Sequence, residues 1–211
     1  MAMKTFINIL LMSGIYSFSF LTVSKAQSPP LTMEQLPISW NNFTHKNIRD
    51  KHAFDAYTKV DCNASGEYWV DKAAHTVRLK LSFYARMDNK ESYVKKSFLK
   101  TADSARSRQL LNHEIGHWII SMIYFHQLVH DLETFRYDYR VRYQLDSIRR
   151  VYYALARAEQ LQYDLETNHS KNARQQQLWE ARLLDRLYQA YGTKIDFPAS
   201  FTKELTITDI H

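Results

Sequence analysis

The chain has 211 residues, of which 45% are hydrophobic and 14% aromatic, with only 4 Gly and 4 Pro. This composition excludes a disordered or collagen-like chain and favours a folded globular domain. The formal net charge is +6, but Lys and Arg are interspersed with acidic residues along the expected helices, so we predict no nucleic-acid partner.

The first 26 residues have the pattern of a secretory leader. Lys4 precedes the apolar run FINILLMSGIYSFSFLTV, which ends in SKAQ with small residues at the positions that a signal peptidase reads. Polar residues inside the run favour removal over retention as an anchor. We therefore expect residues 1–26 to be a cleaved signal peptide. The mature chain would begin at Gln27, have no stable membrane anchor, and reside in the periplasm or outside the cell.

The next segment, residues 27–37, is QSPPLTMEQLP, which is Pro-rich and polar and predicts an extended lead-in. We expect a single domain at residues 38–211. Its first part reads as strands in AFDAYTKV, EYWV and HTVRLKLSF, where apolar and polar residues alternate. NASGE and MDNKES are expected turns. The stretch ESYVKKSF fits either an edge strand or the start of the helical part.

From about residue 102 onward the apolar period becomes helical. Thr101 is the expected N-cap of a first helix that ends near His130, and a second helix is expected at about 133–162. A third is expected from about 171 to Tyr191, capped by Ser170 and stopped by Gly192. The polar stretch QYDLETNHS would link the last two. The predicted fold is α+β and zincin-like: a small antiparallel sheet packed on the first helix, with two further C-terminal helices.

The first helix carries RQLLNHEIGHWIISM, which contains His113 and His117 four residues apart. Four residues advance an α-helix by about 400°, so the two imidazoles lie about 40° apart and can bind one ion. Glu114 lies beside the first histidine and can accept a proton from a zinc-bound water, as in HExxH metallopeptidases. The apolar residues predicted to bury this helix are Leu110, Leu111, Ile115, Trp118, Ile119 and Met122. We predict one bound Zn²⁺.

A catalytic zinc usually takes a third protein ligand. The metzincin spacing is excluded, because Ile120 and Ile123 stand where it needs Gly and His. Thermolysin-like enzymes place a glutamate ligand 19 or 20 residues after the second histidine, where this chain has Arg136 and Tyr137; Glu133 lies close to that window and is kept as a poor candidate. His126 and His130 form a second pair, but His126 lies about 13 Å along the helix from His117 and on the opposite side.

The stretch QYDLETNHS supplies better candidates. We favour His169 as the third ligand, with Asp164 orienting its imidazole through the other ring nitrogen. Asp164 remains the alternative ligand, because zinc also accepts two histidines and a carboxylate. Cys62 is the only cysteine, cannot form an internal disulfide, and is expected to be structural or neutral.

Several of these motifs occur together in one known family. ISWNNF, the ESY segment, LLNHEIGHW and YDLETNHSKNARQQQLWEARL resemble the bacterial secreted proteins grouped as domain of unknown function nine hundred and twenty-two, described as predicted zinc-dependent proteases. The resemblance implies that His113, His117 and His169 bind the metal and that Glu114 is the base. It also implies supporting roles for Tyr163, Asp164 and Thr167. The chain departs from the family pattern at Trp118 and Ser170.

These observations favour a secreted zinc-dependent peptidase that acts on a peptide or protein substrate, with Glu114 as general base. Tyr93 is a candidate substrate contact or oxyanion donor, and the chain near Ser92 and Tyr93 is a candidate edge for pairing with an extended substrate. The alternative is a secreted, zinc-stabilised binding or assembly protein with little catalytic activity. A hydrolase of cell-wall amides is a third hypothesis. The sequence carries no signal for an oligomeric state.

Overall fold

The computed structural model describes residues 31–50, 54–192 and 199–207, which form an α+β fold. The expected signal peptide and its cleavage site lie outside these ranges. Where we expected an extended lead-in, residues Met33–Gln35 form a 3-10 turn, η1, and Met33 and Leu36 are buried in the core. A second turn, η2, spans Trp40–Asn42. No helix among the described residues is long and apolar enough to span a membrane.

The larger sheet contains β3 (Val60–Asp71), β4 (Thr76–Met87) and β6 (Ala199–Ile207), in the order β3-β4-β6 and antiparallel throughout. The alternation predicted for HTVRLKLSF is confirmed, because β4 is buried at every second residue. These residues are Val77, Leu79, Leu81, Phe83 and Ala85. The expected end of the third helix at Gly192 is confirmed, but strand β6, which lies beyond it, was not predicted.

The expected turn at NASGE is wrong, since β3 runs through it and turns only after Asp71. Gly66 serves packing here. A Cβ at this position would lie 3.0 Å from Leu81 Cδ2 and 3.6 Å from Leu145 Cδ1, on helix α3 (Val141–Thr167). The glycine therefore leaves room for the Leu81 side chain on the paired strand β4, whereas the distance to Leu145 would be an ordinary van der Waals contact.

The smaller sheet contains β1 (Thr44–Lys46), β2 (Ala56–Tyr57) and β5 (Tyr93–Lys95), in the order β1-β5-β2. β1 is parallel to β5 and β2 is antiparallel to it, so this sheet is mixed and the expectation of purely antiparallel pairing is wrong. The ambiguous stretch ESYVKKSF divides into β5 and a short helix, α1 (Lys96–Thr101). β5 is the central strand, so it offers no open edge at Tyr93.

Three long helices follow: α2 (Ser104–Thr134), α3 and α4 (Ala173–Tyr191). The expected N-caps are wrong at both places. Asp103 caps α2 by accepting from the Arg106 N–H, and Asn172 caps α4 by accepting from the Gln175 N–H. Helix α3 extends to Thr167, so most of the stretch QYDLETNHS, which was expected to be a linker, forms the last turns of this helix.

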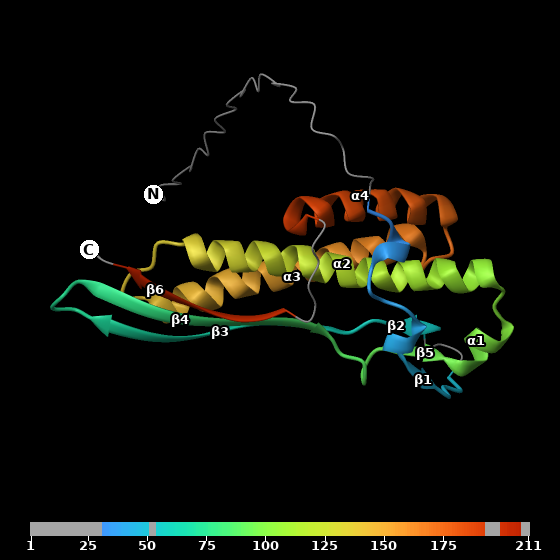
Figure 1. Cartoon of the computed structure of the whole chain (residues 1–211), viewed down its shortest axis with the longest axis horizontal. Helices are drawn as coiled ribbons and strands as arrows, with labels where there is room; N and C mark the ends of the chain where they lie inside the picture. Colours follow the sequence, from blue (N-terminus) through green and yellow to red (C-terminus); the bar gives the residue numbers. More distant parts are fainter. Residues whose placement is uncertain (1–30, 51–53, 193–198, 208–211) are drawn as a thin grey trace, which may run out of the picture. The chain divides into compact units, whose positions relative to one another are not determined.

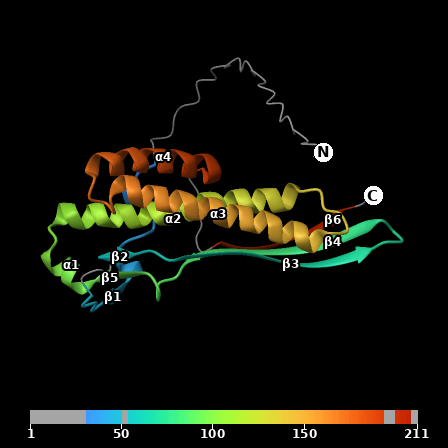
Figure 2. The ribbon, with the colours of Figure 1, turned by 180° about the vertical axis from the view of Figure 1, so that it is seen from behind.

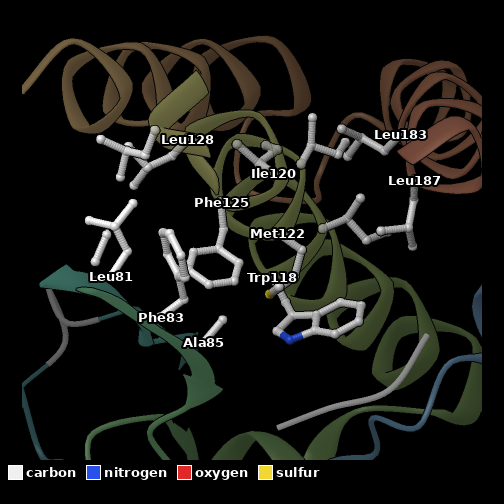
Figure 3. Close-up of a cluster of buried hydrophobic side chains, with 14 of the residues drawn as sticks. Leu81, Phe83, Ala85, Trp118, Ile120, Met122, Phe125, Leu128, Leu183 and Leu187 are labelled. Carbon is white, nitrogen blue, oxygen red and sulfur yellow. The ribbon is translucent and has the colours of Figure 1, made fainter. Parts of the chain in front are cut away.

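Helix α2 is the centre of the fold. In Figures 1 and 2 the α2–α3 pair lies between the β3-β4-β6 sheet and α4. Figure 3 shows Leu81 and Phe83 of β4 on one side of Phe125 and Trp118 of α2, with Leu183 and Leu187 of α4 beyond α2. The predicted buried face of α2 is confirmed for Leu110, Ile115, Trp118, Ile119 and Met122. A helix buried on several sides is a rigid base for a site.

Candidate metal centre

The two histidines of the HExxH motif converge as their spacing predicts. The Nε2 atoms of His113 and His117 are 3.2 Å apart, and the rings lie 4.7 Å apart at nearly a right angle. Two nitrogen ligands on a tetrahedral zinc, each at 2.0–2.1 Å, would be separated by about 3.3 Å. The observed spacing therefore fits two ligands of one ion.

Asp164 on α3 completes a group of three. Its Oδ1 lies 3.1 Å from His113 Nε2 and 3.1 Å from His117 Nε2. These residues form a candidate metal-binding triad, with ligand atoms that all lie within 4.8 Å of one another. Two imidazole nitrogens and a carboxylate oxygen match the donor atoms of known His, His, carboxylate sites.

The electrostatics of the triad favour a cation. Burial opposes ionisation of Asp164, but hydrogen bonds with His113 and His117 outweigh it and hold the pKa of Asp164 well below its usual range. Burial also opposes protonation of His117. Its bond to Asp164 and the negative charges of Glu114 and Asp164 outweigh that effect and raise the pKa of His117. The carboxylates of Asp164 and Glu114 therefore favour a positive charge at the histidines, either a proton or a metal ion.

Glu114 is buried, with 3% of its surface exposed. Its Oε2 accepts a hydrogen bond of 2.6 Å from the hydroxyl of Thr58, which also contacts the Glu114 carbonyl oxygen at 3.2 Å. Thr58 lies in the short connection between β2 and β3. Sequence reasoning missed this residue, because nothing in the motif indicates a partner 56 positions away.

Tyr163 and Thr167 of α3 pack against His113. The Tyr163 ring stacks on the His113 ring, with centroids 4.6 Å apart and planes 18° apart. Its hydroxyl donates to the His113 carbonyl oxygen at 3.2 Å. The Thr167 hydroxyl donates to the Tyr163 carbonyl oxygen at 2.6 Å. Burial raises the pKa of Tyr163 well above its usual value, so this phenol stays neutral and holds α3 against α2.

His169 contacts the triad through Asp164. Its Nδ1 lies 3.2 Å from Asp164 Oδ1, and its ring packs 4.9 Å from the Phe54 ring. His169 and its two neighbours, Asn168 and Ser170, all have positive φ, at 49°, 49° and 67°. Such backbone is costly for residues other than glycine, by about 1 kcal/mol or more each, and must be held by its surroundings.

Arg106 of α2 holds this turn. Its Nη1 donates to Ser170 Oγ at 2.8 Å and to the Ser170 carbonyl oxygen at 3.3 Å. Ser170 is fully buried. The His169 N–H also donates to the Asp164 carbonyl oxygen at 3.1 Å. These bonds keep a strained turn in place directly beside the triad.

Tyr93 lies in the middle of the smaller sheet. Partial burial, followed by the negative charge of Glu114, raises the pKa of Tyr93, which places it in the electrostatic reach of the site. The Nζ of Lys46 lies 5.0 Å from the centre of its ring. Because β1 and β2 flank β5, the proposed edge pairing at Ser92–Tyr93 has no open strand. β2 is the edge strand that lies near Glu114.

The second histidine pair does not join the triad. The His126 ring packs 5.0 Å from that of Tyr191 at the end of α4. Burial, followed by the nearby His130, lowers the pKa of His126. Glu133 also lies outside the described cluster.

The fold and the site together define an α+β protein with a candidate metal centre between its two longest helices. No protein-family profile, curated protein or solved structure matches this chain. The resemblance to the secreted protease family therefore stays a prediction from the sequence motifs.

Proposed function

We propose that this protein is a zinc-dependent peptidase with a zincin-like fold that acts outside the cytoplasm. The observation that carries the proposal is the approach of three ligand atoms, from His113, His117 and Asp164, beside the buried carboxylate of Glu114. A purely structural metal site needs no such carboxylate next to its ligands.

The residues present fit zinc. Their distances of 3.1 to 3.2 Å suit three corners of a tetrahedron, and a fourth corner would admit a water molecule. A zinc ion bound there would lower the pKa of that water to about 7 and polarise a substrate carbonyl. We assign Asp164 as the third ligand because its Oδ1 contacts both histidines, with His169 donating its Nδ1 hydrogen to the same oxygen.

Glu114 would act as general base. In peptide hydrolysis it accepts a proton from the attacking water and passes it to the nitrogen of the leaving amine. The Thr58 hydroxyl holds one carboxylate oxygen, which fixes the direction of the other. The charge of Glu114 contributes to the raised pKa of Tyr93, and Tyr93 is our candidate for contact with the substrate carbonyl.

One observation favours a second function. His169 lies against Asp164, so a small turn movement would place four protein ligands around the ion. A site with four protein ligands is characteristic of structural zinc. The alternative is therefore a secreted, zinc-stabilised binding or assembly protein.

A peptide-library experiment separates the two functions. The purified exported protein, zinc-loaded or chelator-treated, is incubated with a mixed peptide library and cleavage is read by mass spectrometry. We expect zinc-dependent cleavage that falls by about 10²- to 10⁴-fold in Glu114→Gln, with zinc content unchanged. Near-normal cleavage by Glu114→Gln rejects the mechanism. Absence of cleavage, with unfolding on zinc removal, favours the binding protein.

A further inference from the structure

Each histidine of the triad has a glutamine on its outer nitrogen. Gln176 of α4 places its Oε1 3.1 Å from His113 Nδ1. Gln160 of α3 places its Oε1 in hydrogen-bond contact with His117 Nδ1. Two different helices thus supply the same chemical group to the two ligands, on the side away from Asp164.

The orientation of both amides is fixed by their other ends. The Nε2 of Gln160 donates to the His117 carbonyl oxygen at 2.9 Å and to Ser121 Oγ at 3.1 Å. The Nε2 of Gln176 donates to Glu180 Oε1 at 3.1 Å and to the Tyr163 hydroxyl at 2.8 Å. A carbonyl or carboxylate oxygen only accepts, so each glutamine must turn its NH₂ toward it and its oxygen toward the histidine.

An amide oxygen also only accepts. A histidine nitrogen that contacts it must therefore carry a hydrogen, and in the neutral ring the other nitrogen then has the free lone pair. In both rings that other nitrogen is Nε2, which contacts the Asp164 carboxylate and, without a metal, donates a hydrogen to it. A metal ion would displace this hydrogen from Nε2, and the glutamine would hold the remaining hydrogen on Nδ1.

We propose that Gln160 and Gln176 are positioning residues that select the Nδ1–H tautomer of His117 and His113 and thereby set the metal affinity of the site. This inference rests on the proposed metal site but not on peptidase activity. Outer hydrogen-bond partners of ligand histidines typically contribute about 10- to 100-fold to metal affinity. Neither glutamine belongs to the HExxH motif, and each acts through a side chain on another helix.

The test compares leucine and glutamate at each position, in the full protein. Leucine removes the glutamine acceptor, which leaves His113 Nδ1 only a longer contact of 3.4 Å with the Thr167 hydroxyl, whereas glutamate keeps an acceptor oxygen. We expect Gln176→Leu and Gln160→Leu each to weaken zinc binding by about 10- to 100-fold in chelator competition. Gln176→Glu and Gln160→Glu lose the donor to Glu180 or to the His117 carbonyl oxygen but keep the acceptor, so they should bind zinc more tightly than the matching leucine variants. Gln177→Leu and Gln162→Leu, at exposed positions of the same helices, are the matched controls.

A spectroscopic measurement on the wild type keeps the inference testable even if a leucine variant fails to fold. Nitrogen-15 NMR of the metal-free protein should show a hydrogen on Nδ1 of both rings, and zinc should then shift only Nε2. A bare Nδ1 in either ring overturns the inference, as do leucine variants that bind zinc like the wild type. If the wild type takes up no zinc, the proposed function fails, but the Nδ1 hydrogens still decide the tautomers.

Discussion

The hydroxyl oxygen of Tyr163 lies against Gly116, at a point where a Cβ on residue 116 would come within 2.3 Å of it. The glycine in HEIGH therefore admits a tyrosine from α3. That close approach lets Tyr163 stack on His113 and reach its carbonyl oxygen. It also brings Asp164, the next residue, to the two histidines.

Gly116→Ala should consequently destabilise both the fold and the site. The Tyr163 ring is rigid and fully buried, so it cannot move aside easily, and overpacking of this kind costs about 1–3 kcal/mol of unfolding free energy. Urea denaturation measures the loss. Tyr163→Leu in the same background should recover part of it, and purely additive effects in this double-mutant cycle would show that the two residues do not interact.

The two histidine pairs of α2 should differ in metal binding. His113→Ala or His117→Ala each removes a ligand from the triad, so we expect zinc content to fall from about one ion per chain to near zero. His126→Ala and His130→Ala should leave it unchanged, because His126 packs on Tyr191. Metal analysis of the four purified variants decides. If zinc content instead fell in His126→Ala and His130→Ala but not in His113→Ala and His117→Ala, the metal site would lie nearer the end of α2.

Substitutions of Asp164 and His169 should lower zinc affinity to different extents. Asp164→Asn removes the charge and the ligand oxygen that contacts both histidines, so zinc affinity should fall by at least about 100-fold. His169→Ala removes a hydrogen bond to that oxygen and should weaken binding by about tenfold. Competition with a chelator of known affinity measures both. If His169→Ala has the larger effect, His169 is the ligand and Asp164 its support.

Cys62 should be unreactive in the folded protein. Burial, followed by the charge of Asp61, raises its pKa from 9.0 to about 12, so the thiolate fraction at pH 8 is about a thousandfold lower than in the unfolded chain. Alkylation by iodoacetamide should be correspondingly slow until urea unfolds the protein. Because the folded pKa is raised, the unfolded state loses this proton first. Stability should therefore fall from about pH 9 toward pH 12, and Cys62→Ala should remove that part of the pH dependence.

Local patterns predicted the centre of the molecule well. The spacing of His113 and His117 requires their convergence once a helix forms, and the alternation along β4 requires one buried face. The stretch around Asp164 was harder, because its polar residues resemble a linker. Tyr163 and Thr167 are four residues apart and both buried, which is a helical signal hidden among polar neighbours.

Contacts between distant segments were beyond local reasoning. Gln160 and Gln176 depend on how α3 and α4 pack on α2, and no short pattern encodes that packing. In isolation Gly66 indicates a turn, but in the fold it leaves room for Leu81 on the paired strand β4. The sequence of β6 gives only a weak strand signal: Phe201, Leu205 and Ile207 are separated by even numbers of residues, as on one face of a strand. Its partner β4 lies more than a hundred residues earlier in the chain.

Thr58 provides the sharpest test of how Glu114 is held. Thr58→Val keeps the shape of the side chain but removes the hydroxyl that donates to Glu114 Oε2. The carboxylate would then lose its fixed direction, and hydrolysis of a peptide that the wild type cleaves should fall by about 10- to 100-fold, the loss typical of an outer partner. Zinc content should stay at the wild-type level, because Thr58 touches no ligand of the triad. Thr58→Ser restores the hydroxyl and should recover most of the activity. Equal rates for the valine and serine variants would mean that this hydrogen bond does not position the base.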